Sequence, residues 1–346
     1  MARTKPSRLE LDLITEAKKY GHKVTATQLE RWRQRLWLPR TNEWLDADGC
    51  TIRSEIVQRT IDLAKASAPG HSISWVGWVF WALDDTPDTA EQLRKALLAT
   101  LMRPFTKTGV DVGSVPRGDS DEAHEAREKI AAQLLKNRRS PRRDLDGTLR
   151  SYAADAGVEL PPSRSVPNMF HRVLTERGAR MMVGGTGDVG FEGLLESWER
   201  IWPEGRARID RIRDAHREAE LAGVDLTARS PMADGILGLM RAVEQADDRQ
   251  LCAAVRACTK ASGTLGTLWA RAAAEGRPEI IPQLMNDVMW DEWVRAGGLA
   301  LQGAAGEAGV AISTVQYLIV PGWAEDLHRY QALMNTLLLG PSGAHH

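Results

Sequence analysis

The sequence is poor in cysteine and in long apolar runs. It holds 3 cysteines in 346 residues, and the spacing of Cys252 and Cys258 fits neither a zinc ligand pair nor a CxxC redox motif. No run of about 18 apolar residues predicts a membrane span, and the basic first residues are followed by a charged segment instead of the apolar centre of a signal peptide. We therefore expect a soluble, cytoplasmic protein with no membrane partner.

The sequence also lacks an excess of one charge. Lys and Arg number 45 and Asp and Glu number 46, giving a formal net charge of −1. No overall basic character therefore predicts a polyanion partner, and any such site must be local. Residues 1–110 hold 17 basic and 13 acidic side chains, whereas the rest of the chain is acidic. The positive part is the N-terminal one.

Strand-like alternation is scarce, and most segments place apolar residues three and four positions apart, which predicts an all-α protein. Hydrophobic residues make up 43% and charged residues 26% of the chain, as in globular proteins. Helices are expected over 8–20, 26–36, 54–66, 72–83, 89–101, 121–136, 147–156, 168–177, 191–202, 204–221, 232–246, 249–261, 265–274, 282–296 and 323–339. The β-branched segment 311–320 fits either a buried helix or a strand.

A stretch rich in Pro and Gly, residues 104–120, predicts a domain boundary. We expect an N-terminal domain over 1–110 and a larger helical domain over 121–340. The apolar segments within 311–339 exceed what one short helix usually buries, so this second domain is expected to provide an oligomer interface or a ligand cavity.

Residues 24–40 form the segment with the clearest functional pattern. Thr25 followed by Gln28 is a capping box, which predicts that a helix begins there. Leu29, Trp32 and Leu36 are spaced to form its buried stripe. The opposite side holds polar and cationic groups only: Thr27, Gln28, Arg31, Gln34 and Arg35.

Arg, Gln and Thr on a short exposed helix reach phosphate oxygens and base edges in a major groove. The expected helix over 8–20, joined by a short turn, would complete a helix-turn-helix. We therefore predict a site for double-stranded DNA made of helix residues and their flanks: Lys23, Thr25, Thr27, Gln28, Arg31, Trp32, Gln34, Arg35 and Arg40.

The run from Leu29 to Arg40 resembles the MerR and excisionase type of winged helix-turn-helix. The resemblance implies that Trp32 packs near the DNA backbone, that Leu38-Pro39-Arg40 starts the wing and that Arg40 contacts a phosphate. It covers about the first hundred residues, with 41–51 as the wing, where Asp48-Gly49 suits a hairpin turn, and 52–66 as the next helix. Two positions depart from the family: Glu30 stands where many members have Arg, and Leu36 where they have Gly.

This interpretation makes the protein a sequence-specific, non-catalytic DNA-binding regulator, a MerR-like transcription factor or an excisionase-like factor of a mobile element. A monomeric module makes few base contacts, so a homodimer on two half-sites is expected. The larger domain would supply dimerisation or the binding of a small-molecule effector or protein partner. We expect no catalytic residue, no metal site and no cofactor.

An enzymatic alternative rests on Asp84-Asp85-Thr86-Pro87-Asp88, which follows a tryptophan-rich helix. This DDxxD run resembles the Mg²⁺-binding motif of class I terpene cyclases. The second metal motif of those enzymes is incomplete here, since residues 286–292 lack its Ser and its final acid. We therefore favour a helix end and a turn, with Thr86 or Asp88 capping the next helix, and with the tryptophans as core.

Two further motifs have less specific interpretations. Gly185, Gly187 and Gly190 satisfy GxGxxG, but no βαβ unit surrounds them, so an interhelical loop is expected. The basic run 136–143 would either follow a phosphate backbone or serve as a solvated linker.

Overall fold

The computed structural model describes residues 6–67, 73–136, 144, 147, 168–201, 206–225, 232–276, 280 and 306–339. In this part of the chain the protein is all-helical, and its only β pairing is one isolated antiparallel bridge between Leu45 and Ile52. The helices are α1 (Arg8–Lys19), α2 (Ala26–Gln34), α3 (Ser54–Ala66), α4 (Ser74–Asp84), α5 (Pro87–Thr108), α6 (Asp121–Lys136), α8 (Met169–Val189), α9 (Phe191–Ile201), α10 (Arg206–Leu221), α11 (Gly235–Gln245), α12 (Asp248–Ala274), α15 (Glu307–Ile319) and α16 (Trp323–Leu339).

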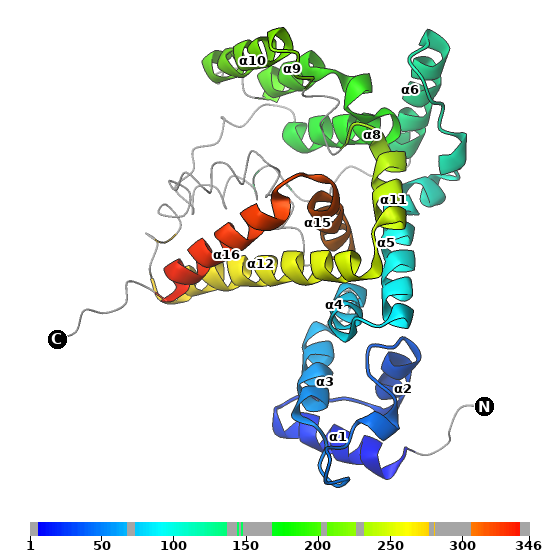
Figure 1. The fold of residues 1–346 in the computed structure, drawn as a ribbon, viewed down its shortest axis with the longest axis vertical. Helices are drawn as coiled ribbons and strands as arrows, with labels where there is room; N and C mark the ends of the chain where they lie inside the picture. The colour runs from blue at the N-terminus through cyan, green and yellow to red at the C-terminus, as the bar shows by residue number, and fades with distance from the viewer. Residues whose placement is uncertain are drawn as a thin grey trace, which may run out of the picture.

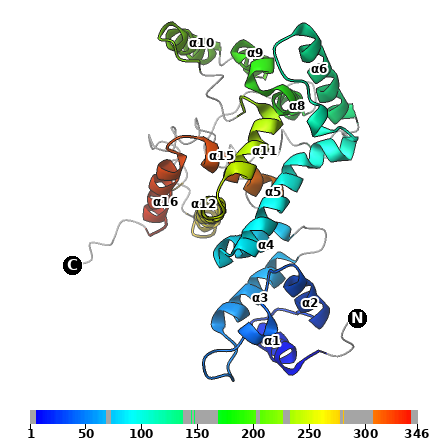
Figure 2. The same cartoon turned by 45° about the vertical axis from the view of Figure 1, so that its right-hand side comes forward.

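The helices are arranged along an elongated molecule (Figure 1). The first three, α1 to α3, form one end, where α1 packs on α2 and α3. Next to them lies α4, which contacts α3 on one side and α5 and α12 on the other. The opposite end holds α6 and α8 to α10, as the rotated view also shows (Figure 2).

Two hydrophobic clusters hold the described part together. The larger one runs from the first helices through the tryptophans of α4 into α5, α11 and α15, so it joins the two ends of the molecule. The smaller one lies between α12 and α16, where Trp323, Tyr330 and Met334 are buried against Leu265 and Leu268. The apolar surface of α15 and α16 is thus largely covered within the chain, and it does not by itself indicate an oligomer interface.

Helix α5 differs from the sequence prediction at both ends. It begins at Pro87, where Thr86 caps it, and it continues through Pro104 to Thr108 instead of ending near residue 101. Leu101 and Phe105 are buried on either side of the proline, so packing outweighs the lost backbone hydrogen bond. Helix α5 packs against α11, α12 and α15. The segment 104–120 therefore does not start as a loop, and α5 associates with helices of the predicted second domain.

Two other differences from the sequence prediction lie in segments that contain glycine. The break expected between 261 and 265 is absent, because α12 is continuous to Ala274. The GxGxxG segment is not an interhelical loop: it forms the kinked end of α8, where Gly185 has a φ of +78°. A Cβ atom at residue 185 would come within 1.8 Å of the Ala233 carbonyl oxygen, so only glycine allows this contact with the start of α11.

Other sequence predictions agree with the structure. Helices α3, α6 and α16 begin and end at the predicted residues, and α15 shows that 311–319 is helical and not a strand. The expected helices over 147–156 and 282–296 lie outside the described residues. Among the described helices, none combines the length and apolar character needed to cross a bilayer.

Candidate nucleic-acid interface

Helix α2 begins with the capping box that the sequence predicts. The Gln28 amide donates to the Thr25 hydroxyl over 3.2 Å, and the Thr25 amide donates to Gln28 Oε1 over 2.9 Å. These bonds satisfy amides that have no partner within the helix. They also engage the side-chain oxygens of both residues, so Thr25 and Gln28 position the start of α2. Of these two side chains, only the NH₂ group of Gln28 remains as a donor toward a ligand.

The buried side of α2 agrees with the predicted stripe at two positions out of three. Leu29 and Trp32 are both fully buried. Trp32 therefore belongs to the core, and a contact between its ring and DNA, as the family resemblance implied, is excluded by its 0% exposure. Leu36 was expected in the stripe but is 37% exposed and has a φ of +55°. Helix α2 ends before it, and the chain turns there through left-handed backbone.

Seven of the nine predicted contact residues are exposed. Four of them form no side-chain hydrogen bond or ion pair with another described residue: Lys23, Thr27, Arg31 and Arg40. Thr27 and Arg31 lie on one face, since they are four residues apart in a helix. No carboxylate of the described residues forms an ion pair with Lys23, Arg31 or Arg40. These three cations are therefore available to an anionic partner.

The acidic side chain on α2 is already engaged. Glu30 forms an ion pair with Arg33 and accepts a hydrogen bond of 3.0 Å from the Gln34 amide. Gln34, another predicted contact, is exposed but held by this bond. The Glu30 charge is thus partly compensated within the helix, and it weakens the positive field of α2 less than an unpaired carboxylate would.

Arg33 has a structural role that the sequence did not predict. Its guanidinium bonds the Glu10 carboxylate of α1 over 2.9 Å, contacts the Thr41 hydroxyl and lies 5.9 Å from the centre of the Trp44 ring. Only 19% of this side chain is exposed. Arg33 therefore fastens α2 to α1 and to the following loop, and it does not point toward a ligand.

The segment predicted as the wing is a compact loop with one bridge instead of a two-stranded hairpin. It contains the short 3₁₀ helix η1 (Thr41–Glu43), and the Asp46 amide donates to the Thr51 carbonyl over 2.8 Å. At its tip, the Thr51 hydroxyl and the Thr51 and Cys50 amides donate to Asp48, which lowers the pKa of this carboxyl to about 2. The tip therefore stays negatively charged, which disfavours phosphate contact there.

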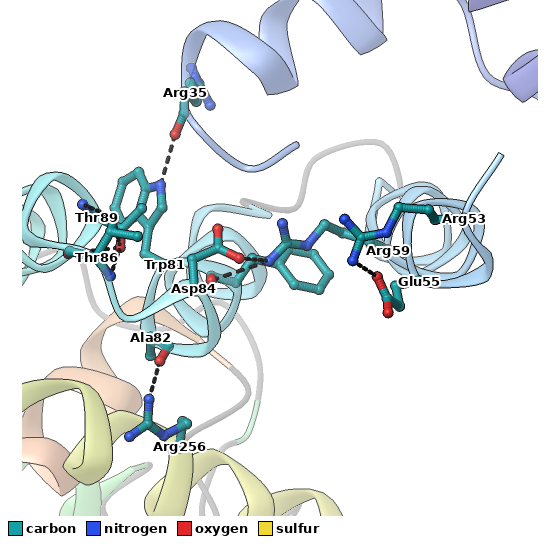
Figure 3. A network of polar contacts seen from close by, with 11 residues as sticks. Arg35, Arg53, Glu55, Arg59, Trp81, Ala82, Asp84, Thr86, Thr89 and Arg256 are labelled. Atoms are coloured by element: carbon teal, nitrogen blue, oxygen red, sulfur yellow. Dashed lines mark hydrogen bonds and ion pairs between the residues drawn. The ribbon is translucent and has the colours of Figure 1, made fainter. Parts of the chain in front are cut away.

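The C-terminal end of α2 lies against α4. The Trp81 indole donates to the Arg35 carbonyl over 2.8 Å, as Figure 3 shows. The Arg35 guanidinium is exposed, but it stacks on Trp37 at 4.8 Å from the ring centre. Arg31 and Arg35, which the sequence placed on one DNA-binding face, thus have different surroundings. Arg31 has no ion-pair partner among the described residues, whereas Arg35 lies at the junction with the larger part of the molecule.

The carboxylates of the DDxxD run bind arginines from two other helices. Asp84 accepts a bond of 2.6 Å from Arg59 of α3 (Figure 3), and Asp85 lies 3.1 Å from Arg256 of α12. Thr86 caps α5, as the sequence predicts. Trp78 and Trp81 are buried beside them, which confirms the tryptophan helix as core. This geometry supports a junction of helices, and it offers no support for the cyclase interpretation.

The structure thus leaves part of the predicted site available for binding and gives other predicted residues a structural role. It leaves Lys23, Thr27, Arg31 and Arg40 accessible, and it assigns Trp32, Thr25 and Arg35 to packing, capping and a helix junction. The basic run 136–143 lies outside the described residues apart from Lys136. Comparisons with protein-family models, curated proteins and solved structures found no match.

Proposed function

We propose that this protein binds double-stranded DNA through the exposed side of α2 and its flanks and acts as a non-catalytic regulator. One observation carries the proposal: α2 follows α1 across a short turn, and its exposed Arg31 and the flanking Lys23 and Arg40 have no carboxylate partner among the described residues. Two helices joined in this way are the framework of a helix-turn-helix, in which the second helix enters the major groove.

The backbone at Leu36 gives the family resemblance independent support. The MerR and excisionase type has glycine at this position, and Leu36 has the left-handed φ that favours glycine. Leu36 departs from the family in residue type, but it takes a backbone conformation that glycine would favour. The compact 41–52 loop then takes the place of the wing. Its acidic tip makes α2 and its flanks the principal contact surface in this proposal.

Few of the predicted contact residues are accessible, and this has a consequence for the oligomeric state. Thr27, Gln28 and Arg31 offer few base contacts, and each good bidentate pair discriminates by only about 1–3 kcal/mol. We therefore propose that a homodimer binds two half-sites about 34 Å apart. In this arrangement the larger helical part provides the dimer contact and carries the regulatory function.

Selection from a random duplex pool at low salt tests the proposal. We expect retained fragments to share a short, paired motif, and the enriched duplex to bind more tightly than a scrambled duplex of equal length. Specific sites are typically about 10³-fold or more tighter than non-specific DNA at physiological salt. Failure to enrich any sequence, with no retention of duplex even at low salt, would count against DNA binding.

A further inference from the structure

The turn that joins α1 to α2 has a backbone fixed by hydrogen bonds. The His22 amide donates to the Ala17 carbonyl over 3.1 Å, and the Gly21 amide donates to the Lys18 carbonyl over 3.0 Å. Together with a φ of +83° at Gly21, these two bonds form a Schellman motif, which closes the C-terminal end of α1. The residues around the turn therefore have defined positions next to the start of α2.

Three residues around this turn present polar groups to solvent: Lys18, Tyr20 and Lys23, which we call the turn patch. All three are exposed, and Tyr20 is 64% exposed although it is a large aromatic residue. No described residue forms a side-chain hydrogen bond with Tyr20 or an ion pair with Lys18 or Lys23. The neighbouring Lys19 differs, because it is paired with Glu16 over 2.5 Å. The turn patch thus has two cations and a phenol hydroxyl that no described side chain binds.

The stability of α1 accounts for only part of this composition. A lysine in the last turn of a helix interacts favourably with the helix dipole, which explains Lys18. It does not explain Lys23, which lies beyond α1, or Tyr20, whose ring gains little burial. A tyrosine hydroxyl between two lysines is, however, suited to phosphate oxygens, which accept hydrogen bonds from both residue types.

The length of α2 relates the turn patch to Arg40. The nine residues of α2 rise by about 13 Å, and the major groove of B-form DNA is about 12 Å wide. The turn patch precedes α2 and Arg40 follows it, so these cations lie at opposite ends of the helix. Where α2 enters the major groove as proposed above, its two ends lie beside the two phosphate backbones that border the groove.

We infer that the turn patch binds the phosphate backbone on one side of the groove that α2 enters, an inference that rests on the proposed function. Lys18 and Lys23 neutralise phosphates, and the Tyr20 hydroxyl donates to a phosphate oxygen. Contacts of this kind fix the register of a DNA-binding helix and carry no sequence information directly. The turn patch therefore adds affinity for every duplex, whereas Thr27 and Arg31 discriminate among sequences.

Fluorescence anisotropy of the full chain with two duplexes tests the turn patch. One is the selected duplex, and the other is a scrambled duplex of equal length. Lys18→Ala should weaken both by the same factor and lower the slope of log affinity against log salt by about 0.9, so the loss is about eightfold at 0.1 M salt and vanishes near 1 M. Tyr20→Phe should weaken both by about threefold and leave the slope unchanged, because the hydroxyl carries no charge.

The adjacent lysine provides the matched control. Lys19→Ala removes an equal charge one residue away, but from a lysine that already pairs with Glu16, and it is expected to leave both affinities unchanged. Lys18→Gln keeps much of the side-chain stem and replaces Lys18→Ala if circular dichroism shows that the alanine variant does not fold. Lys18→Arg should restore binding. A loss in Lys19→Ala equal to that in Lys18→Ala would show a general effect of charge and overturn the assigned contact.

Comparison with Arg31→Ala separates the two proposals. Wild-type affinities and salt slopes in both Lys18→Ala and Tyr20→Phe, together with a loss in Arg31→Ala, would overturn the turn patch and leave the proposed function standing. A loss confined to the selected duplex would contradict the assignment to the backbone, because that pattern requires contact with bases. If the wild-type chain retains neither duplex at low salt, both proposals are wrong.

Discussion

The indole nitrogen of Trp81 donates a hydrogen bond of 2.8 Å to the backbone carbonyl of Arg35. This bond joins α4 to the cap of α2, and it satisfies a carbonyl that the helix end leaves without an intrahelical partner. The same helix α4 is held by Arg59 of α3 and by Arg256 of α12. The proposed DNA-binding helix is therefore fastened to the rest of the molecule through α4.

The packing of Trp37 against Gly77 gives the first prediction. A Cβ atom at residue 77 would come within 2.0 Å of the Trp37 ring, so Gly77→Ala is expected to destabilise the protein by about 1–3 kcal/mol through overpacking. Urea unfolding monitored by circular dichroism measures it. Gly263 lies in a helix with nothing near its Cβ position, so Gly263→Ala serves as the control.

The two substitutions should change the free energy of unfolding in opposite directions. Alanine stabilises an open helical position by about 0.8–1.0 kcal/mol relative to glycine, which is the effect expected in Gly263→Ala. A gain of similar size in Gly77→Ala would show that Trp37 does not lie against α4.

The left-handed backbone at Leu36 predicts an unusual order of stability. Leu36→Gly and Leu36→Ala both remove the side chain, so their difference reports the backbone alone. At a φ of +55° glycine should be more stable than alanine by about 1 kcal/mol. Inside α2 the order reverses, so Gln34→Gly should be less stable than Gln34→Ala. Thermal unfolding of the four variants checks this, and an alanine advantage at residue 36 would place that residue in the helix.

A buried ion pair between α6 and α8 predicts a large loss of stability. Arg127 forms two bonds of 2.6 Å with Asp188 and also donates to the carbonyls of Pro116 and Gly118. Hydrogen bonding to Asp188 raises the pKa of the Arg127 guanidinium above its usual value. Arg127→Ala is expected to destabilise by about 3–5 kcal/mol, because it leaves the Asp188 carboxylate, whose side chain is only 11% exposed, without its main cationic partner.

A double-mutant cycle with Asp188→Ala isolates the pair. The summed losses of unfolding free energy in the two single variants should exceed the loss in the double variant by about 1–3 kcal/mol. Additive losses in denaturant unfolding would contradict the contact.

Thiol reactivity should separate the three cysteines. Cys50 is exposed, whereas Cys252 and Cys258 are buried, and burial raises the pKa of Cys252 to about 11 and that of Cys258 to about 12. The thiolate is the reactive form, so at pH 8 both buried groups stay protonated. A disulfide reagent should modify one thiol in the native protein and three after unfolding. Rapid modification of native Cys50→Ser would contradict the burial of the other two.

Local patterns in the sequence predicted the features that depend on neighbouring residues. The Thr25 and Gln28 capping box, the start of α3 and the core position of the α4 tryptophans each follow from spacing within a few residues. Capping and amphipathicity are local effects, so a single sequence carries them. The path of the chain at Leu36 was not predicted, because an exposed turn after a helix has no strict apolar pattern.

Contacts between distant residues account for what the sequence could not show. Pro104 lies inside α5 because Leu101 and Phe105 pack on a core assembled from helices far along the chain. Arg33 pairs with Glu10, which is 23 residues away, and Arg103 pairs with Glu307, which is 204 residues away. The hydrogen bond between Trp81 and Arg35 likewise forms only when α2 and α4 meet, whereas the tryptophan spacing indicated core packing alone.

Fluorescence anisotropy with a selected duplex gives the most direct test of the central claim. Arg31→Ala removes an exposed guanidinium that no described carboxylate pairs with in α2, and Arg211→Ala removes an equal charge from an exposed site on α10, at the other end of the molecule. We predict that Arg31→Ala lowers duplex affinity by about 1–3 kcal/mol while Arg211→Ala leaves it unchanged. Equal affinities for the two variants and the wild type would contradict the account.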